Sequence, residues 1–463
     1  MKTIFIIVTK GFIVRNILRS GVLELLKSAN FKIVIFISSF RGEPLPEYFI
    51  NEFADENVLL EVVKEPIVGK IYRKFYKLFS ICSTSLIYTE TNWSYSRIGN
   101  VKNLNRNIIW AYVERMIFPI LSKFVCVKRI ARWLELHFFT HDARCYYKYF
   151  DKYDPDLVFS TSIISKVDVA FLKAAQHRKV KTVSMTKGWD HIAKVFFKVI
   201  PDRLVVQNNH LRDCAIRYQM VAADKIDVCG FPNFDWYRRK DIILSREDLF
   251  KRLGFDPSRR LIFFGSEGIW ASNDDNIVDI LENFIDQHKL AKKCNLLVRP
   301  HFTDLKSDRF NRFKNKKNIK VDNNLTKHPF FSDTWDPSVE EVKLFVNCIY
   351  HCDIMVTIAS TLALDACCLD KPIITVGFKS LYSPRTMEDL THILYETDHY
   401  REVLDTNAVD LVKNEEELLE AINNYLLHPE FRHEEREALL DKLCYKVDGQ
   451  SSRRIAEVIK DAL

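Results

Sequence analysis

The sequence predicts an α/β protein with two tandem doubly wound domains, each built around a parallel sheet. Short apolar runs rich in β-branched residues alternate with amphipathic segments, which is the pattern of strand–helix units in parallel sheets. The alternation runs through the chain twice. At 463 residues the chain is also about three times as long as a typical domain of ~150 residues. Two domains, each with its own core, are therefore expected.

In the first half, apolar runs of four to six residues predict six strands, at residues 3–8, 32–36, 58–63, 157–160, 181–185 and 203–206. Helical periodicity between them predicts helices, of which the clearest lie at 13–28 and 166–178. The run at 3–8 is too short for the apolar core of a signal peptide, and no small-residue cleavage site follows it. We interpret it as a buried first strand.

In the second half the same patterns predict strands at 261–264, 295–298, 319–321, 354–357 and 372–376, and helices at 274–290, 339–350, 362–368 and 415–427. The run Gly230-Phe231-Pro232-Asn233 predicts a turn ahead of a polar stretch, and we place the domain boundary there. The predicted domains are residues 1–235, with a basic helical insertion at about 67–150, and residues 236–445. A final helical segment occupies 446–463.

Composition excludes several classes of protein. The longest stretch without a charged residue, 78–89, has 12 residues, well below the roughly 18 to 20 that span a bilayer. We therefore expect a cytoplasmic protein, with the inner face of the cell membrane as a candidate location. Eleven cysteines without a CxxC pair predict reduced, structural thiols. A metal site is the alternative for one group of residues, namely Cys348, His351, Cys352, Cys367 and Cys368.

The basic charge is concentrated in one window. Between Lys70 and Lys148 there are 14 Lys or Arg against 4 Asp or Glu, whereas the whole chain carries a net charge of +7. Aromatic residues interleave with these basic residues, as they do on helices that lie at an anionic membrane surface. The alternative to membrane binding, which the sequence supports equally, is a helical insertion whose basic face is exposed to solvent. Nucleic-acid binding is disfavoured, because no recognisable nucleic-acid module accompanies the charge.

Two adjacent hydroxyls follow the predicted strand 354–357 and precede a helix. Ser360 and Thr361 would lie at the helix N-terminus, where free N–H groups and the helix dipole attract phosphate. Asp365, about one turn further, would accept hydrogen bonds from ribose hydroxyls. The alternative makes Ser360 an ordinary N-cap and Asp365 a solvent-facing residue.

Two more segments of the second half could bind phosphate. Arg299 and His301 come directly after the strand 295–298, and both side chains can donate hydrogen bonds to phosphate oxygens. A structural role is the alternative for a lone histidine at this position. Gly265 and Ser266 follow the strand 261–264, and glycine would let the backbone approach a diphosphate closely.

In the first half, an ammonium, a carboxylate and an imidazole follow the strand 181–185. Asp190 could act as a general base towards an acceptor hydroxyl, with His191 or Lys187 adjusting its charge. The alternative is a turn at Gly188 in which Asp190 caps the next helix. Lys10 and Gly11, after the first strand, would line the same edge. The chain has no GxGxxG, GxxxxGK, HExxH or GxSxG motif, so dehydrogenases, P-loop NTPases, zincins and α/β-hydrolases lose support.

Together these segments resemble the GT-B fold nucleotide-dependent transferases. Within them the chain is most similar to the CDP-glycerol glycerophosphotransferase-like and bacterial surface-polysaccharide glycosyltransferase group. The motifs that carry the resemblance are Trp189-Asp190, the segment 228–235, Arg299-Pro300-His301, Ser360-Thr361 with Asp365, and the segment 448–455. They span roughly residues 155–463.

The resemblance implies two Rossmann-like domains that face each other across a cleft, with the C-terminal helix packing back towards the N-terminal domain. The second domain would bind a UDP-, CDP-, CMP- or GDP-linked donor, and the first would bind a cell-surface glycan or lipid-linked acceptor. Arg299, His301 and the helix terminus at Ser360-Thr361 would stabilise the departing nucleotide phosphate, so neither a metal nor a cofactor is expected. The alternatives are a GT-B fold UDP-sugar epimerase or hydrolase, and a non-catalytic membrane-associated scaffold.

Overall fold

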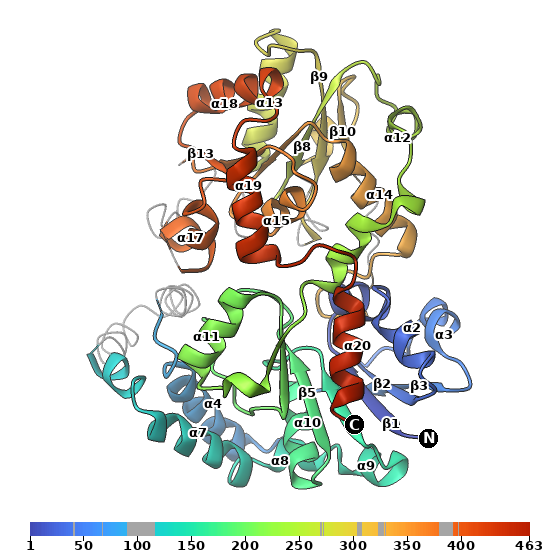
Figure 1. Ribbon diagram of the computed structural model, residues 1–463, viewed down its shortest axis with the longest axis vertical. Coiled ribbons are helices and arrows are strands. Elements are labelled where there is room, and N and C mark those ends of the chain that lie inside the picture. The colour runs from blue at the N-terminus through green and yellow to red at the C-terminus, as the bar shows by residue number, and fades with distance from the viewer. Residues whose placement is uncertain are drawn as a thin grey trace. The chain divides into compact units, whose positions relative to one another are not determined.

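The computed structural model describes residues 1–39, 42–66, 68–89, 116–268, 271, 273–302, 308–322, 328, 330–378, 392–396 and 398–463. The chain forms two compact units. The first comprises Met1–Pro232, His328–Thr334 and Gln450–Leu463, and the second comprises Asn233–Lys327 and Trp335–Gly449. Each unit contains one parallel sheet with helices packed on it (Figure 1). The predicted fold class, two doubly wound α/β domains, is confirmed.

The sheet of the first unit has seven parallel strands in the order β3-β2-β1-β4-β5-β6-β7. Their bounds are β1 Thr3–Val8, β2 Lys32–Ser38, β3 Val58–Val63, β4 Leu157–Ser160, β5 Lys181–Met185, β6 Arg203–Val206 and β7 Ile226–Val228. Strand β1 is buried along its whole length because both faces of the sheet are covered. Ile4, Ile6 and Val8 pack into one core cluster, whereas Phe5 and Ile7 pack into another.

The helices of the first unit connect and cover these strands. They are α1 Gly11–Ile13, α2 Val22–Lys27, α3 Glu47–Phe53, α4 Lys70–Thr84, α7 Val125–His137, α8 His141–Arg144, α9 Tyr147–Tyr153, α10 Lys166–His177, α11 Asn209–Gln219 and α20 Ser451–Asp461, with a π-helical turn η1 Val14–Leu18 and a 3-10 turn η3 Ala223–Lys225. The predicted single helix 13–28 is wrong. Gly21 has φ +111°, so the chain leaves the helical conformation there and restarts as α2.

The sheet of the second unit has six parallel strands in the order β10-β9-β8-β11-β12-β13. Their bounds are β8 Arg260–Gly265, β9 Cys294–Arg299, β10 Ile319–Val321, β11 Ile354–Thr357, β12 Ile373–Val376 and β13 Asp410–Val412. Its helices are α12 Arg246–Leu253, α13 Asp275–Asp286, α14 Val339–His351, α15 Leu362–Cys367, α17 Asp398–Leu404, α18 Glu415–Leu427 and α19 His433–Leu439, with π-helical turns η10 His392–Glu396 and η11 Leu440–Cys444 and 3-10 turns η4 Pro232–Arg238, η5 Lys240–Ile242 and η8 Asn311–Phe313.

Every predicted strand is present in the structure, but two observed strands were not predicted. Strands β7 and β13 are three residues long and lie at the edges of their sheets.

The C-terminal helix α20 packs within the first unit. The Ser452 hydroxyl donates to the Ser20 carbonyl at 2.8 Å, and Arg454 Nε donates to the Cys229 carbonyl at 2.9 Å. Gly230 has φ +85°, and a Cβ there would lie 2.5 Å from the Ser451 hydroxyl. Glycine at this position therefore allows both the backbone conformation and the close approach of α20.

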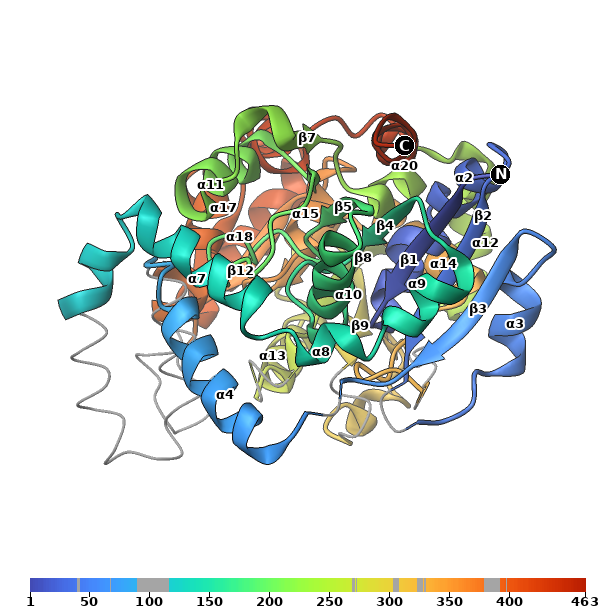
Figure 2. The ribbon, with the colours of Figure 1, turned by 90° about the horizontal axis from the view of Figure 1, so that it is seen from below.

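Helices α4 and α7 of the predicted insertion lie side by side (Figure 1, Figure 2). A fully buried ammonium, that of Lys173 on α10, holds α7 through Glu135 at 2.5 Å and also pairs with Asp142 at 2.9 Å. The Tyr76 hydroxyl of α4 donates to Glu135 at 2.7 Å. The part of the insertion at 90–115 lies outside the described residues. No helix in the described part of the chain has the length and apolar character needed to cross a membrane.

Removing the charge of Lys173 should destabilise the first unit. Lys173→Met leaves two buried carboxylates without their cation, a change that typically costs about 3 to 5 kcal/mol. We expect the thermal unfolding midpoint to fall by about 5 °C or more. Lys166→Met is the matched control on the same helix, because the pair of Lys166 with Glu65 is largely exposed and should contribute no more than about 1 kcal/mol. Equal midpoints for the two variants would contradict this assignment.

Candidate functional site

The strand order of the second sheet places its switch point between β8 and β11. From β8 the chain continues to one side of the sheet through β9 and β10, and from β11 it continues to the other side. Ligands of doubly wound sheets bind beyond the carboxyl ends of the strands at this point. Of the predicted donor residues, Gly265 is the last residue of β8 and Ser266 follows it, and Ser360 and Thr361 follow β11. The hydroxyl of Thr357 joins the strands by donating to the Gly265 carbonyl at 3.1 Å.

Gly265 lies in close contact with the first residue of α15. A Cβ at this position would lie 2.1 Å from Cδ1 of Leu362. The side chain of Leu362 therefore occupies the space that a side chain at residue 265 would need.

Ser266 is buried and its hydroxyl is used inside the protein. It accepts hydrogen bonds from the Gly268 N–H at 3.1 Å and from Arg309 Nη2 at 3.0 Å. Arg309 also pairs with the buried Asp274 at 2.7 Å. Arg309 therefore fixes the loop after β8. This role of Arg309 was not predicted, because a single arginine in a polar stretch has no distinguishing pattern.

Arg299 ends β9, and its guanidinium is held by protein groups. It forms an ion pair with Asp322 and lies 4.4 Å from the centre of the Phe345 ring. His301 is half-buried, with its ring centre 4.1 Å from that of Phe302. Phe302 in turn stacks on Trp335 at 5.6 Å and an interplanar angle of 6°.

The residues after β11 differ in exposure. Thr361 is exposed, and the half-buried Ser360 accepts a hydrogen bond from the Leu362 N–H at 3.5 Å. Asp365 is buried and accepts a hydrogen bond from the Tyr237 hydroxyl at 2.6 Å. The alternative of a solvent-facing Asp365 is therefore wrong. Tyr237 belongs to η4, far away in sequence, so the sequence did not indicate this contact.

The first sheet has its switch point between β1 and β4. The segment after β1 contains Lys10 and Gly11. The loop residue Asp333 contacts this segment. The Asp333 carboxylate accepts hydrogen bonds from the N–H groups of Gly11 at 3.0 Å and Phe12 at 3.2 Å. Lys10 Nζ donates to the Ser332 hydroxyl at 2.9 Å. Burial raises the pKa of Asp333.

A second carboxylate, that of Asp168, is fully buried after β4. It accepts hydrogen bonds from the hydroxyls of Ser160 at 2.8 Å and Ser165 at 2.9 Å, and from the Ser162 N–H at 3.0 Å. The Ser165 hydroxyl also lies 3.0 Å from that of Thr9, which follows β1. Burial raises the pKa of Asp168 to about 7. This group was missed in the sequence, where Asp168 has the position of an ordinary first-turn acid of a helix.

Asp190 and His191 lie in contact after β5. Asp190 Oδ1 is 3.1 Å from His191 Nδ1, and Asp190 Oδ2 forms an ion pair with Lys194. His191 Nδ1 is also 3.1 Å from the Gly188 carbonyl. Turns follow these residues, so the alternative in which Asp190 caps a helix is wrong. A Cβ at Gly188 would lie 2.9 Å from His191 Nδ1, so a side chain at this position would displace the His191 ring.

The charged groups at this edge influence one another. Burial lowers the pKa of Lys187, and the positive charge of Lys10 lowers it further. The negative charges of Asp190, Asp168 and Asp333 raise the pKa of Lys187. Burial also lowers the pKa of His191. The structure thus gathers the three predicted residues Lys10, Lys187 and Asp190 at the carboxyl edge of the first sheet, together with two acids that were not predicted.

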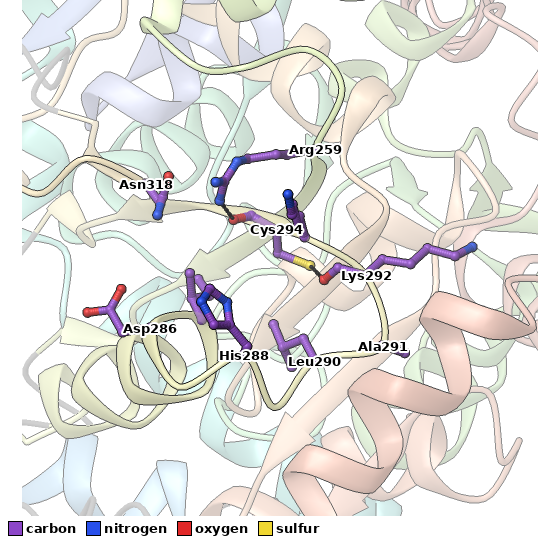
Figure 3. A pocket seen from close by; sticks show the side chains of 10 residues that line it. Arg259, Asp286, His288, Leu290, Ala291, Lys292, Cys294 and Asn318 are labelled. Carbon is purple, nitrogen blue, oxygen red and sulfur yellow. Dashed lines mark hydrogen bonds between the residues drawn. The ribbon is translucent and has the colours of Figure 1, made fainter.

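One pocket of the second unit lies away from these groups. It has a volume of about 540 Å³ and includes Arg259, His288, Cys294 and Asn318 in its lining (Figure 3). Cys294 is the first residue of β9, and Asn318 precedes β10. The pocket is therefore at the amino edge of the sheet, opposite the switch point.

The cysteine-rich group predicted as an alternative metal site is structural. His351 Nε2 lies 2.8 Å from the Leu244 carbonyl, and Cys352 Sγ donates to the Ile349 carbonyl at 3.1 Å. Burial raises the pKa of the thiols of Cys348 and Cys368. Across the described residues, no group of three or more His, Cys, Asp or Glu side chains is arranged to hold a metal ion.

Comparison with solved structures supports the fold. A UDP-GlcNAc 2-epimerase from Neisseria meningitidis, bound to UDP-GlcNAc, matches with a TM-score of 0.57 at 12% identity, covering 100% of both chains. The S. aureus protein MnaA, in a structure with UDP, matches with a TM-score of 0.55 at 12% identity, covering 99% of this chain and 96% of that one. The wall teichoic acid polymerase TagF, soaked with CDPG, matches with a TM-score of 0.53 at 11% identity, covering 100% of this chain and 88% of that one.

Two Rossmann-like units, each with a parallel sheet, define a protein of the GT-B fold class. The model of the CDP-glycerol:poly(glycerophosphate) glycerophosphotransferase family matches residues 197–461, more than half of the chain. The protein therefore belongs to this family, which confirms the resemblance stated from the sequence and the prediction of a transferase. A search of curated proteins with the sequence gave no significant match.

The buried Asp168 should make stability depend on pH. Its pKa is about 7 in the folded protein and about 3.9 in an unfolded chain. Between these values the folded protein retains a proton that the unfolded chain has released, so the contribution of Asp168 to the free energy of unfolding falls as pH rises. The free energy of unfolding is compared between the wild type and Asp168→Asn. We expect the difference, wild type minus variant, to fall by about 4 kcal/mol between pH 4 and pH 8.

Urea unfolding at a series of pH values measures this difference. Asp213→Asn, at an exposed position of α11, is the matched control. A difference between wild type and Asp168→Asn that is constant across the pH range would contradict the buried, proton-retaining state of Asp168.

Proposed function

We propose that the protein transfers glycerol phosphate from CDP-glycerol to a hydroxyl of a cell-surface glycan or lipid-linked acceptor. The observation that carries this proposal is the family match over residues 197–461, which spans the whole second unit and its switch point. The likeness to TagF soaked with CDPG agrees with it at the level of the fold. In this proposal the second unit binds the donor and the first unit binds the acceptor.

The reaction is a single in-line displacement at phosphorus. The acceptor oxygen forms a bond to the phosphorus that carries glycerol, the bond from that phosphorus to the bridging oxygen breaks, and CMP leaves. The hydroxyl proton goes to a base in the first unit. The charge that develops on the departing phosphate needs positive or hydrogen-bonding groups in the second unit.

His191 is the base that the geometry supports best. Its Nδ1 lies 3.1 Å from two acceptors, the Gly188 carbonyl and Asp190 Oδ1, so Nδ1 carries the hydrogen in the neutral ring. Nε2 is then the nitrogen that can accept a proton. Burial lowers the pKa of His191 and favours this neutral form. Asp190, paired with Lys194, fixes the ring orientation in this proposal, whereas the sequence suggested Asp190 as the base.

In the second unit, His301 and Thr361 are the groups proposed to contact the departing phosphate. The guanidinium of Arg299 pairs with Asp322 and packs on the Phe345 ring. We therefore propose that Arg299 holds the end of β9 in position and does not contact the phosphate. The Asp365 carboxylate, held at one oxygen by Tyr237, is proposed to accept a hydrogen bond from the ribose. The backbone after Gly265 is proposed to approach the diphosphate.

The pH profile tests the base. If neutral His191 accepts the proton, kcat/KM rises with pH through a pKa below the usual histidine value of about 6.5 and then levels off. His191→Gln should lower kcat/KM by about 10²-fold or more and remove this limb. Asp190→Asn should keep the rise of kcat/KM with pH, but the pKa of this rise should change because Asp190 contacts His191. The assay is CMP release from CDP-glycerol with a glycerol phosphate polymer as acceptor.

His288→Gln is the control for this series, because His288 is exposed and lies at the opposite edge of the second unit. If His191→Gln keeps the wild-type profile and Asp190→Asn abolishes activity, the base is Asp190 and not His191.

Ligand-induced stabilisation tests the donor. CDP-glycerol at 100 times its Kd adds about 2.7 kcal/mol to the folded state, which should raise the unfolding midpoint by several degrees. His301→Ala and Asp365→Asn should reduce this shift, and Asp286→Asn, in the pocket at the opposite edge, should leave it unchanged.

The other functions give different outcomes in the same assays. A shift with UDP-GlcNAc but not with CDP-glycerol, followed by release of an epimerised sugar in the absence of acceptor, would identify an epimerase. No shift with any nucleotide at millimolar concentration would overturn the donor site and favour a scaffold.

A further inference from the structure

The pocket at the amino edge of the second sheet has a cationic rim (Figure 3). Lys292 and Lys293 line it from the segment before β9, and Arg259 lines it from the segment before β8. The amide of Asn318 lines it from the segment before β10. Three neighbouring strands thus each bring polar side chains to the same pocket. Among the described residues of the lining, the one carboxylate is that of Asp286.

The chain segments that precede β9 and β10 are strongly basic. Segments 288–293 and 314–318 together contain six lysines and no Asp or Glu. In the described part of the chain, the ammonium groups of Lys292, Lys293 and Lys317 form no ion pair. The pocket and its rim therefore carry positive charge that the described protein does not neutralise.

Hydrogen bonds hold these basic segments in place. The Lys293 carbonyl accepts from the first residue of β8 at 2.9 Å, and the Asn318 carbonyl accepts from a residue of β9 at 2.8 Å. The side-chain amide of Asn423, on α18, accepts from the Ala291 N–H at 2.7 Å and donates to the Lys289 carbonyl at 3.2 Å. The walls of the pocket are thus fixed in the folded protein, and a ligand does not have to order them.

Arg259 is oriented by the floor of the pocket. Its Nη1 donates to the Cys294 carbonyl at 3.3 Å, and its Nε lies 3.7 Å from Asp256. Burial raises the pKa of the Cys294 thiol to about 12, and the positive charges of Arg259 and Lys292 act to lower it. Two cations from different segments therefore lie close enough to act on one group at the floor.

The lining favours a chain of phosphate groups over other anionic partners. Within the described structure it has no Phe, Tyr or Trp on which a nucleobase could stack. Ile285 is buried and Leu290 is half-buried, so the lining lacks the projecting apolar side chains of a membrane-binding surface. Lysine and arginine side chains donate charge-assisted hydrogen bonds to phosphate oxygens.

We propose that this pocket binds the glycerol phosphate polymer at a segment remote from the reacting end of the polymer. Each unit of the polymer carries one negatively charged phosphodiester, which Lys292, Lys293 and Arg259 would contact. The proposal rests on the proposed function, in which this polymer is acceptor and product. Binding of a remote segment raises the effective concentration of the reacting end, so a long acceptor is used at lower concentration than a short one.

The position of the pocket sets a minimum length for this effect. Strand β8 runs from the pocket edge to the switch point and has six residues, which corresponds to about 20 Å. A glycerol phosphate unit has as many backbone atoms as two amino-acid residues and extends by at most about 7 Å. An acceptor of two units therefore cannot reach both places, whereas a long polymer can.

Acceptor length provides the kinetic test. Lys292→Glu combined with Lys293→Glu should raise KM for a long glycerol phosphate polymer by about tenfold. The kcat, the KM for a two-unit acceptor and the KM for CDP-glycerol should not change. Lys317→Glu, before β10, should act in the same direction, and Asp286→Asn should lower KM for the long polymer because it removes the carboxylate of the lining. The unfolding midpoints should equal that of the wild type, because these lysines form no ion pair in the described structure.

Fluorescence anisotropy of an end-labelled glycerol phosphate polymer measures binding without catalysis. The Kd should increase as salt is raised, and Lys292→Glu combined with Lys293→Glu should raise it by about tenfold. Unlabelled polymer, inorganic phosphate, single-stranded DNA and phosphatidylglycerol vesicles are added as competitors. If any of the last three displaces the probe at a lower phosphate concentration than unlabelled polymer does, the assignment to the polymer is overturned.

A matched control lies at the amino edge of the first sheet. Lys179→Glu combined with Lys181→Glu changes two exposed lysines at the start of β5. This variant should show the wild-type KM for the long polymer and the wild-type Kd. An equal loss in this control and in the pocket variant would show that only the overall charge matters, and would overturn the site.

The pocket proposal and the proposed function fail separately in these assays. If the wild type releases CMP with the polymer but Lys292→Glu combined with Lys293→Glu uses and binds the polymer as the wild type does, the pocket proposal is overturned and the function stands. If the wild type releases no CMP with any acceptor, the proposed function is overturned. Polymer binding that the same double variant weakens would then still support the pocket.

Discussion

The common direction of the strands in each sheet is the constraint on which the rest of the structure depends. Parallel strands are joined by crossovers that run over the faces of the sheet, so both faces are covered and the central strands are buried. Strand β1, buried at all six residues, is the clearest case. The same direction brings the carboxyl ends of all strands to one edge. Polar residues that follow β1, β4 and β5 therefore gather there although they are far apart in sequence.

Charged groups buried in the first unit position segments that the sheet itself does not hold. Lys173 joins α10 to α7, and Asp333 ties the loop 328–334 to the start of α1 through the N–H groups of Gly11 and Phe12. Burying a charge is costly unless it is paired and hydrogen-bonded. Each of these groups has such partners, and each fixes one element in a defined place. Asp168 differs, because it is held by hydroxyls and an amide and retains its proton up to about neutral pH.

The candidate site was predictable in its location and only partly in its residues. Gly265, Ser360, Asp190 and His191 follow strands that the sequence predicts, so their position at the sheet edges follows from the fold class. The partners that decide their roles were not predictable. Arg299 is held by Asp322, Asp365 by Tyr237, and Gly11 by Asp333, a residue 322 positions away. No periodic pattern in a sequence indicates such pairs.

The sequence by itself determined eleven of the strands, most of the main helices, the doubly wound class and the sheet edge at which the candidate site residues lie, because apolar runs and their periodicity are local properties of the chain. Tertiary structure alone decided three further features. It placed α20 and the loop 328–334 in the first unit, it buried Asp168 and Asp365, and it gathered the basic segments 288–293 and 314–318 at one edge of the second sheet. These features depend on which distant segments meet. The burial and partners of a side chain are set by that encounter and not by its neighbours in sequence.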